Sequence, residues 1–168
     1  DASQSAGVLE IDFKRLDADF MAMPGHKALF GPQGTGILIC KNTGKVLLSG
    51  GSGSESINQY MPEFLPDRHE AGTHNVPGIA GLGAGLRFLQ RTGVEKIGQR
   101  ENLQMRRCAN GLRKLGFSVF SGAHQAGTVS FLAPGDCEEL ASRLAKRGIA
   151  VRAGLHCAPL AHKSAGTL

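Results

Sequence analysis

Two residues near the start of the chain have side chains that could act together in covalent chemistry. Asp1 opens the segment Asp-Ala-Ser-Gln-Ser-Ala-Gly, and Lys27, 26 residues later, closes Pro-Gly-His-Lys. A lysine amine can hold an aldehyde as a Schiff base, and a carboxylate can keep a pyridine nitrogen protonated so that the ring draws electrons. This pair therefore suggests pyridoxal 5'-phosphate chemistry, although an isolated charged residue is usually only a surface residue.

The elements around Asp1 and Lys27 should place both residues at neighbouring ends. The mostly apolar run at residues 18–23 predicts a short buried strand, which ends just before Lys27. Ligands of α/β sheets gather at strand ends, because loops and helix termini converge there. We therefore expect the acid and the lysine to lie at the ends of neighbouring elements.

The remainder of the chain alternates strand and helix patterns. A second apolar strand is predicted at 36–40, and helices are predicted at 76–90 and 94–115, with Gly93 ending the first helix. Beyond Gly116 the pattern is strand, strand, helix, strand, which indicates a small α+β domain. Its predicted elements are 117–120, 128–132, 136–147 with Asp136 as N-cap, and 149–152.

Composition favours a cytoplasmic globular protein. A chain of 168 residues with 41% hydrophobic content can bury one core, and no export signal or membrane span is visible. The four cysteines lack metal-ligand spacing, so neither a zinc site nor a disulfide framework is expected. Much of the positive charge lies at 87–114, where eight basic residues meet two acidic ones. Without interleaved aromatic residues, this stretch predicts a solvated helical face rather than a nucleic-acid surface.

Three motifs in a fixed order carry a family resemblance that covers essentially the whole chain. They are Asp-Ala-Ser-Gln-Ser-Ala-Gly at 1–7, Gly-His-Lys at 25–27 followed by Gly-Pro-Gln-Gly-Thr-Gly, and Arg-Ala-Gly-Leu-His-Cys-Ala-Pro at 152–159. In this combination the chain resembles the cysteine desulfurases and selenocysteine lyases of the class V aminotransferase family. The stretch 69–86 also looks like that family's approach to a long helix. Any one motif alone would be weak evidence, since short glycine patterns recur widely.

The resemblance implies an α/β fold of the pyridoxal phosphate-dependent transferases (fold type I), with a mostly parallel sheet in the large domain. The expected boundaries are 1–92 for the C-terminal half of that domain, 93–115 for a linking helix, and 116–168 for a small α+β domain that carries a cysteine loop. Family members are considerably longer, so we expect an internal fragment that is inactive alone. An arginine that binds the substrate carboxylate in the family should lie just past Leu168.

The resemblance also implies how the cofactor would be bound. Lys27 would hold pyridoxal 5'-phosphate covalently, Asp1 would face its pyridine nitrogen, and Gln4 would donate a hydrogen bond to its phenolic oxygen. His26 would contribute at the phosphate end, and Thr73 would reach the partner subunit's phosphate across a homodimer interface. The proline before Gly-His-Lys departs from the pattern, because many desulfurases have a phosphate-binding serine there.

Cys157 separates desulfuration from other pyridoxal reactions. In the desulfurases its thiolate attacks the sulfur of L-cysteine and leaves a persulfide and L-alanine, whereas the selenocysteine lyases act on L-selenocysteine. Arg152 and His156 are expected to bind the substrate and to favour the thiolate. The resemblance further implies a sulfur-acceptor protein and a role in iron–sulfur cluster assembly, with no nucleic-acid or membrane partner. Two alternatives remain open: another class V activity such as aminotransfer, and a non-catalytic assembly module without cofactor.

Overall fold

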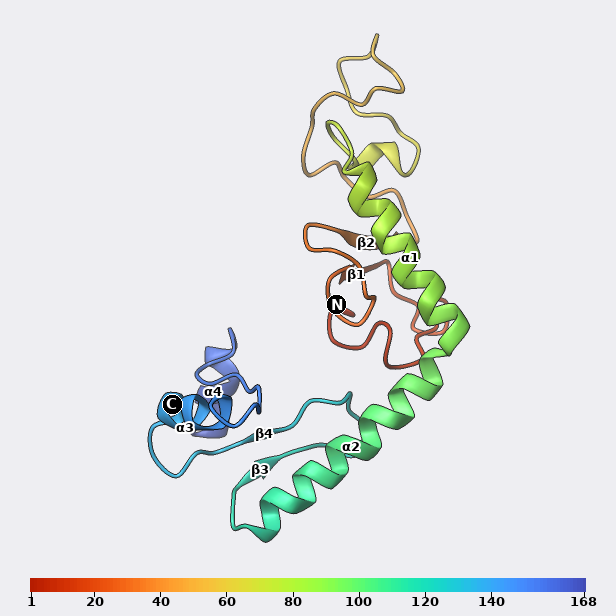
Figure 1. Ribbon diagram of the computed structural model, residues 1–168. Helices are drawn as coiled ribbons and strands as arrows, with labels where there is room; N and C mark the ends of the chain where they lie inside the picture. The colour runs from red at the N-terminus through yellow and green to blue at the C-terminus, as the bar shows by residue number, and fades with distance from the viewer. The chain divides into compact units, whose positions relative to one another are not determined.

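The chain forms two compact units. The computed structural model describes all residues from 1 to 168 (Figure 1). The first unit is Asp1–Asn102 and the second is Leu103–Leu168, so the boundary falls inside helix α2 (Val94–Lys114). Each unit contains an antiparallel pair of strands together with helical segments, which makes the chain a mixed α/β protein. None of the helices combines the length and hydrophobicity needed to cross a bilayer.

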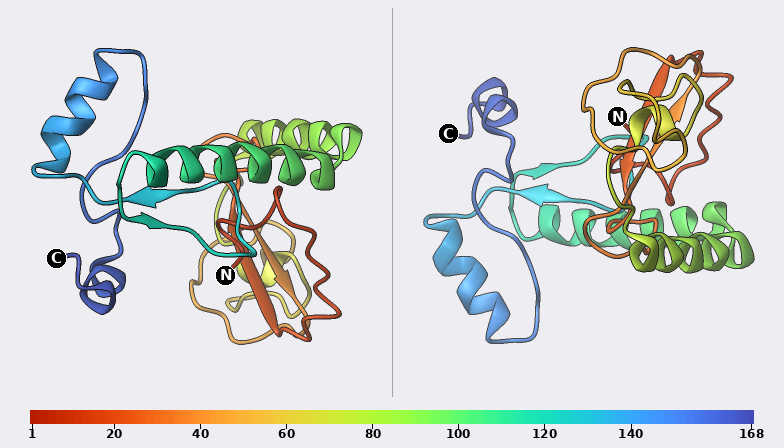
Figure 2. Two further views of the ribbon diagram at one scale, coloured as in Figure 1. Left: turned by 90° about the horizontal axis from the view of Figure 1, so that it is seen from below. Right: turned by 90° about the horizontal axis from the view of Figure 1, so that it is seen from above.

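The sheet of the first unit consists of β1 (Phe20–Pro24) and β2 (Gly36–Cys40), which lie side by side in Figure 2. They pair antiparallel, with Met21 opposite Ile39 and Met23 opposite Ile37. Because side chains alternate between the two faces of a strand, this register puts both methionines on the same face. The mostly parallel sheet that the family implies is therefore not seen among the strands of these 168 residues.

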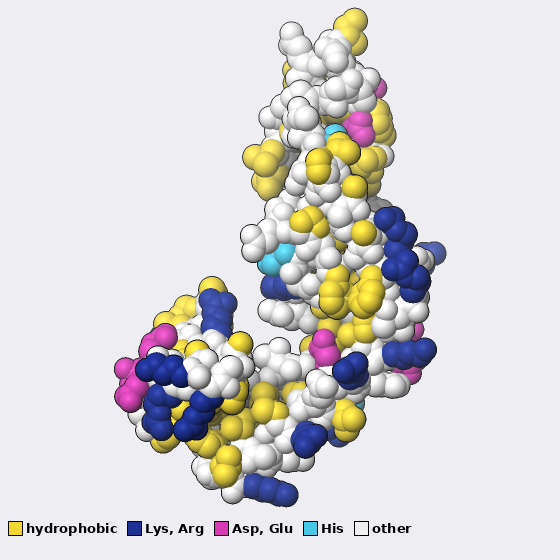
Figure 3. Space-filling view, viewed as in Figure 1, with side chains coloured by type: hydrophobic (Ala, Val, Ile, Leu, Met, Phe, Trp, Pro, Cys, Tyr) yellow, Lys and Arg dark blue, Asp and Glu magenta, His cyan; other side chains and the backbone are white.

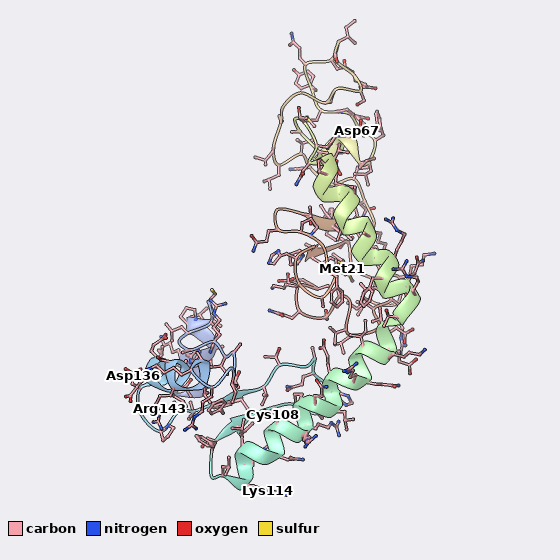
Figure 4. The ribbon with its side chains drawn as sticks, viewed as in Figure 1. Met21, Asp67, Cys108, Lys114, Asp136 and Arg143 are labelled. Atoms are coloured by element: carbon pink, nitrogen blue, oxygen red, sulfur yellow. The ribbon has the colours of Figure 1, made fainter.

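One core joins the start of the chain, the strand pair and the following helix. Met21, labelled in Figure 4, is one of its buried residues. The cluster includes alanines from the first motif and leucines from the lysine-bearing turn and from helix α1, so these segments are packed together although they are separated in sequence. The buried members are Ala2, Ala6, Met21, Leu29, Leu82 and Leu89.

Helix α1 (Val76–Thr92) has clear start and stop signals. The Asn75 side chain accepts a hydrogen bond from the Gly78 N–H at 3.1 Å, which satisfies one of the free amides at the helix start. Gly93, with φ of 87°, ends the helix and donates to the Leu89 carbonyl at 2.8 Å. The buried positions 78, 82, 85 and 89 recur at helical spacing, so one face of α1 meets the core.

The long connection between β2 and α1 is held mainly by side chain to backbone hydrogen bonds. It includes the short 3-10 helix η1 (Asp67–His69). The Arg68 guanidinium donates to the Gly44 carbonyl at 3.0 and 3.1 Å, and His69 Nε2 lies 2.7 Å from the Thr43 carbonyl oxygen. These contacts fix the segment that leads to Thr73 against the turn after β2.

The second unit contains the end of α2, the strands β3 (Val119–Phe120) and β4 (Ser130–Phe131), and the helices α3 (Cys137–Ala145) and α4 (Pro159–Ala165). The two strands pair antiparallel, and the rings of Phe117 and Phe131 meet edge to face with centroids 5.3 Å apart. Asp136, at the start of α3 in Figure 4, accepts hydrogen bonds from the Glu138 and Glu139 amides, as predicted for an N-cap.

One sequence expectation for the second unit is wrong, and one helix was not predicted. No strand forms at 149–152, because that segment has no partner strand. Instead Gly148 adopts φ of 75° and the Ile149 N–H donates to the Leu144 carbonyl at 3.0 Å, which closes the end of α3. Helix α4 was not expected at all. Its signals are Pro159 in the first turn and Gly166 in the left-handed conformation after the last.

The apolar residues of the predicted helix 94–115 recur as an approximate helical stripe, which predicts one buried face, and this expectation is only partly met. The stripe consists of Ile97, Leu103, Met105, Leu112 and Leu115. Leu103 and Leu115 are 71% and 76% exposed, whereas the buried residues of the helix are Met105 and Ala109, four positions apart. The basic residues of 87–114 are all exposed along α1 and α2, as predicted for a solvated helical face. Figure 3 shows Lys and Arg side chains in dark blue on the surface of this face of the molecule.

Candidate functional site

The first motif packs directly against the turn that carries Lys27. The Ala2 N–H donates to the Ala22 carbonyl at 2.9 Å, in the middle of β1. Gly7, with φ of 90°, lies so close to the backbone of Ala28 that a Cβ there would overlap its carbonyl oxygen. Two backbone contacts therefore tie the segment with the predicted acid to the strand and turn with the predicted lysine. The expectation of neighbouring elements is met at the level of the backbone.

Backbone hydrogen bonds close the lysine turn. The Gly25 N–H donates to the Thr35 carbonyl at 2.8 Å, and the Gly31 N–H donates back to the Gly25 carbonyl at 2.8 Å. Within this loop, the Phe30 N–H donates to the carbonyl of Lys27 itself at 3.0 Å. The lysine backbone is thus fixed while its side chain is exposed to solvent.

Helix α1 packs against the lysine turn through small residues. A Cβ added at Gly85 would overlap the Leu29 carbonyl oxygen, so only glycine allows the helix to come this close. Next to this contact, the rings of Phe30 and Phe88 meet edge to face with centroids 5.0 Å apart. The turn that carries the lysine is therefore packed against both the first motif and α1.

The side chains predicted to bind a cofactor are exposed. Asp1 Oδ1 accepts hydrogen bonds from the Ser3 N–H at 2.8 Å and from the Ser3 hydroxyl, which orient the carboxylate. Gln4, His26 and Lys27 are exposed, and the Lys27 amine forms no ion pair with a carboxylate. Backbone contacts join the segments that carry these side chains, and the side chains make no direct hydrogen bonds with one another.

Thr73, the remaining predicted cofactor ligand, lies three residues before α1 and is exposed. Nearby, Gly78 at the start of α1 packs against the Thr35 methyl group, and Thr35 in turn lies against Gly25 of the lysine turn. The start of α1 is therefore tied to the same turn. The structure does not bring the Thr73 side chain into a hydrogen bond with any other predicted site residue of this chain.

The cysteine motif forms an exposed loop in the second unit. Arg152 Nη2 donates to Cys157 Sγ at 3.5 Å, so a guanidinium lies beside the predicted nucleophile. His156 and Cys157 have φ of 52° and 61°, a left-handed conformation that non-glycine residues seldom adopt. Three residues that the sequence singled out are thus adjacent in one loop.

Sequence reasoning missed His162, which contacts this loop, and Thr167, which contacts His162. The ring of His162, on α4, lies nearly parallel to that of His156, with centroids 6.1 Å apart and planes at 24°. His162 Nδ1 also lies 2.9 Å from Thr167 Oγ1. The helix signals around Pro159 could have placed His162 one turn after the cysteine, but no local pattern indicated the ring contact.

A pocket lies beside the strand pair rather than at Lys27. It has a volume of about 530 Å³, and Ser3 of the first motif lines it together with Cys40, His69 and Glu70 among mostly apolar residues. Because Lys27 is not part of its lining, we do not assign the cofactor to it. The chain has no group of three or more His, Cys, Asp or Glu side chains that could hold a metal ion.

The chain matches known proteins over nearly all of its length. The family model for class V aminotransferases matches residues 1–167. A probable cysteine desulfurase of Pyrococcus abyssi is 39% identical over 168 residues, covering 94% of this chain and 42% of that protein. The apo structure of a cysteine desulfurase from Thermococcus onnurineus NA1 has a TM-score of 0.83 and 34% identity, covering 98% of this chain and 44% of that one.

A third relative is a C-DES mutant with glycine covalently linked to its PLP cofactor, with a TM-score of 0.68 and 29% identity, covering 89% of this chain and 42% of that one. The chain thus spans less than half the length of each of these relatives. The expected resemblance and fold class are confirmed by the match over nearly all residues and by the shared fold. The chain belongs to the class V aminotransferase family and is homologous to cysteine desulfurases.

Proposed function

We propose that the whole protein is a pyridoxal phosphate-dependent cysteine desulfurase that converts L-cysteine to L-alanine and leaves a persulfide on Cys157. One observation carries the proposal within this family: Arg152 Nη2 lies 3.5 Å from Cys157 Sγ in an exposed loop. A sulfur acceptor must be accessible, and the guanidinium places a positive charge beside this exposed thiol. An aminotransferase would have no use for this arrangement.

The side chains of the first unit suit each end of pyridoxal phosphate. When bound, this cofactor supplies an aldehyde that takes up amines and a ring that draws electrons from the substrate. Lys27 offers an amine with no carboxylate partner, and Asp1 offers a carboxylate oriented by Ser3. Gln4 and His26 add an exposed amide and imidazole for the phenolic oxygen and the phosphate.

In this proposal each residue has a defined task. With the cofactor bound, the Asp1 carboxylate would favour a protonated ring nitrogen, and the Lys27 amine would be the base available to move a proton on the substrate. Cys157 Sγ attacks the substrate sulfur, so that the new S–S bond forms as the C–S bond breaks. The released carbon takes up a proton and becomes the methyl group of alanine. One thiol and one cysteine give one persulfide and one alanine, with no external oxidant or reductant.

The finer features of substrate, partner and location are also proposals. L-selenocysteine is the alternative substrate, because selenium would be attacked in the same way as sulfur. The exposure of Cys157 supports passage of the sulfur to an acceptor protein, as iron–sulfur cluster assembly requires. All four cysteines are free thiols, and three are exposed, which supports a reducing compartment such as the cytoplasm.

We further propose that the whole protein is a homodimer in which Thr73 contacts the phosphate in the partner subunit. Thr73 is exposed and forms no hydrogen bond with another site residue of its own chain. The preceding connection also exposes large apolar side chains: Leu47, Ile57 and Tyr60 are 91%, 96% and 85% exposed. Exposed apolar side chains in one segment support an interface there.

The test uses the whole protein with pyridoxal phosphate and L-cysteine. Alanine should be released, and alkylation with peptide mapping should locate the persulfide on Cys157. The Cys157→Ala variant should keep the visible absorbance of the bound cofactor and lose the persulfide. Cys137→Ala is the matched control, because Cys137 is also exposed in the second unit and should leave both properties unchanged.

Other outcomes would identify the alternatives. A persulfide on Cys40, Cys108 or Cys137, or full activity in Cys157→Ala, would overturn the proposed mechanism. A keto acid product with the cofactor in its amino form would indicate an aminotransferase. A protein that shows no cofactor absorbance would be a non-catalytic member of the family.

A further inference from the structure

The backbone at the cysteine needs support from its surroundings. His156 and Cys157 are consecutive non-glycine residues with φ of 52° and 61°. Such a conformation persists only where neighbouring contacts hold it. The Ala158 N–H donates to the Leu155 carbonyl at 2.9 Å, and the His162 N–H donates to the Ala158 carbonyl at 3.2 Å, so the loop leads directly into α4.

The side chain of His162 contacts this loop. Its ring lies nearly parallel to the ring of His156, at a centroid distance of 6.1 Å. The ring of His162 also contacts Thr167. Its Nδ1 atom lies 2.9 Å from Thr167 Oγ1 and 3.3 Å from the Thr167 carbonyl oxygen. The Thr167 N–H also donates to the His162 carbonyl at 3.0 Å. His162 and Thr167 are half-buried, whereas His156 and Cys157 are exposed.

We propose that His162 is a positioning residue for Cys157. Its ring, oriented by Thr167, packs on His156 and holds the loop so that the thiol stays beside the Arg152 guanidinium. The inference rests on the proposed role of Cys157 as the sulfur acceptor and extends it, because it assigns the placement of the thiol to a residue of α4. His162 itself does not touch the thiol or the substrate in this role.

The test compares two alkylating reagents on the whole protein with its cofactor and without L-cysteine. Iodoacetate is anionic and iodoacetamide is neutral, and both react with the same thiolate. The ratio of their rates at one cysteine therefore cancels accessibility and ionisation and reports the local charge. Opposite unit charges about 4 Å apart in water attract by about 1 kcal/mol, so a guanidinium beside the thiol should favour iodoacetate about fivefold.

Peptide mapping gives this ratio separately for Cys157 and for Cys137, the exposed cysteine at the start of α3 in the same unit. Arg152→Ala defines the ratio at Cys157 without the guanidinium. We expect His162→Ala to lower the Cys157 ratio to the Arg152→Ala value, about fivefold below wild type. His162→Phe keeps an aromatic ring that can pack on His156, and it should restore most of the wild-type ratio. Cys137 should give the same ratio in every variant.

Three results would overturn the inference. The first is an unchanged Cys157 ratio in His162→Ala. The second is a ratio that falls in His162→Phe as far as in His162→Ala, since ring packing would then not be the cause. The third is a parallel change at Cys137, which would show a general loss of structure in the unit. The measurement needs no turnover, so a protein that makes no persulfide but shows the expected ratios would refute only the desulfurase proposal.

Discussion

Replacing Gly7 with alanine should weaken the contact that joins the first motif to the lysine turn. Gly7 has φ of 90°, and a Cβ at this position would overlap the Ala28 carbonyl oxygen. The left-handed backbone costs an L-residue roughly 1–2 kcal/mol. Forcing a methyl group into a packed site costs about 1–3 kcal/mol more. We therefore expect the free energy of unfolding of the first unit to fall by about 2–5 kcal/mol.

Gly34→Ala is the matched control for this substitution. Gly34 has φ of 74° and no atom within 4 Å of the position that a Cβ would take. It therefore shares the backbone strain of Gly7 but lacks the overlap, and its replacement should cost roughly 1–2 kcal/mol. The difference between the two variants measures the contact with Ala28.

Hydrogen exchange read by mass spectrometry is the appropriate assay, because two compact units need not unfold together and exchange reports each peptide separately. Protection of the peptides covering β1 and β2 should fall in both variants, and further in Gly7→Ala. Peptides from α3, in the second unit, serve as the internal reference and should not change. Equal losses of protection in the two variants would refute the argument that Gly7 is required by its contact with Ala28.

Two further predictions concern the N-cap of α3 and the lysine. Asp136→Ala should reduce the stability of α3 by about 1 kcal/mol, because the carboxylate accepts from the Glu138 amide at 2.8 Å, whereas Asp136→Asn keeps the acceptor and should cost much less. Hydrogen exchange of α3 that is the same in all three proteins would contradict this role. Borohydride reduction of the cofactor-loaded whole protein, followed by peptide mapping, should find the cofactor on Lys27. A label on Lys41 or Lys45 would show that the lysine was misassigned.

The sequence by itself determined the elements whose signals are local. Strand β2 and the starts of α1 and α2 lie where the apolar patterns predict them, because an amphipathic period and its capping residues act within a few positions. Gly93 and Asp136 end and begin helices for the same reason. The order of three motifs was also enough to indicate the family, which the comparisons confirm.

Tertiary structure decided the features that depend on partners far away in the sequence. The apolar run at 149–152 forms no strand, because a strand needs another strand to accept its hydrogen bonds and this one has none. Leu103 fits a helical stripe yet is exposed, because periodicity does not say which side of a helix will be covered. In both cases the local pattern is compatible with burial, and only the fold determines whether a partner is present.

The same limit applies to the candidate site. The sequence supplied the residue types, but it did not show that Gly7 packs on Ala28 or that His162 packs on His156. The first contact spans 21 residues, and the second depends on a helix that the sequence pattern did not reveal. Contacts between distant side chains depend on how segments pack into a shared core and on backbone conformations such as that of Cys157. Neither can be read from a run of neighbouring residues.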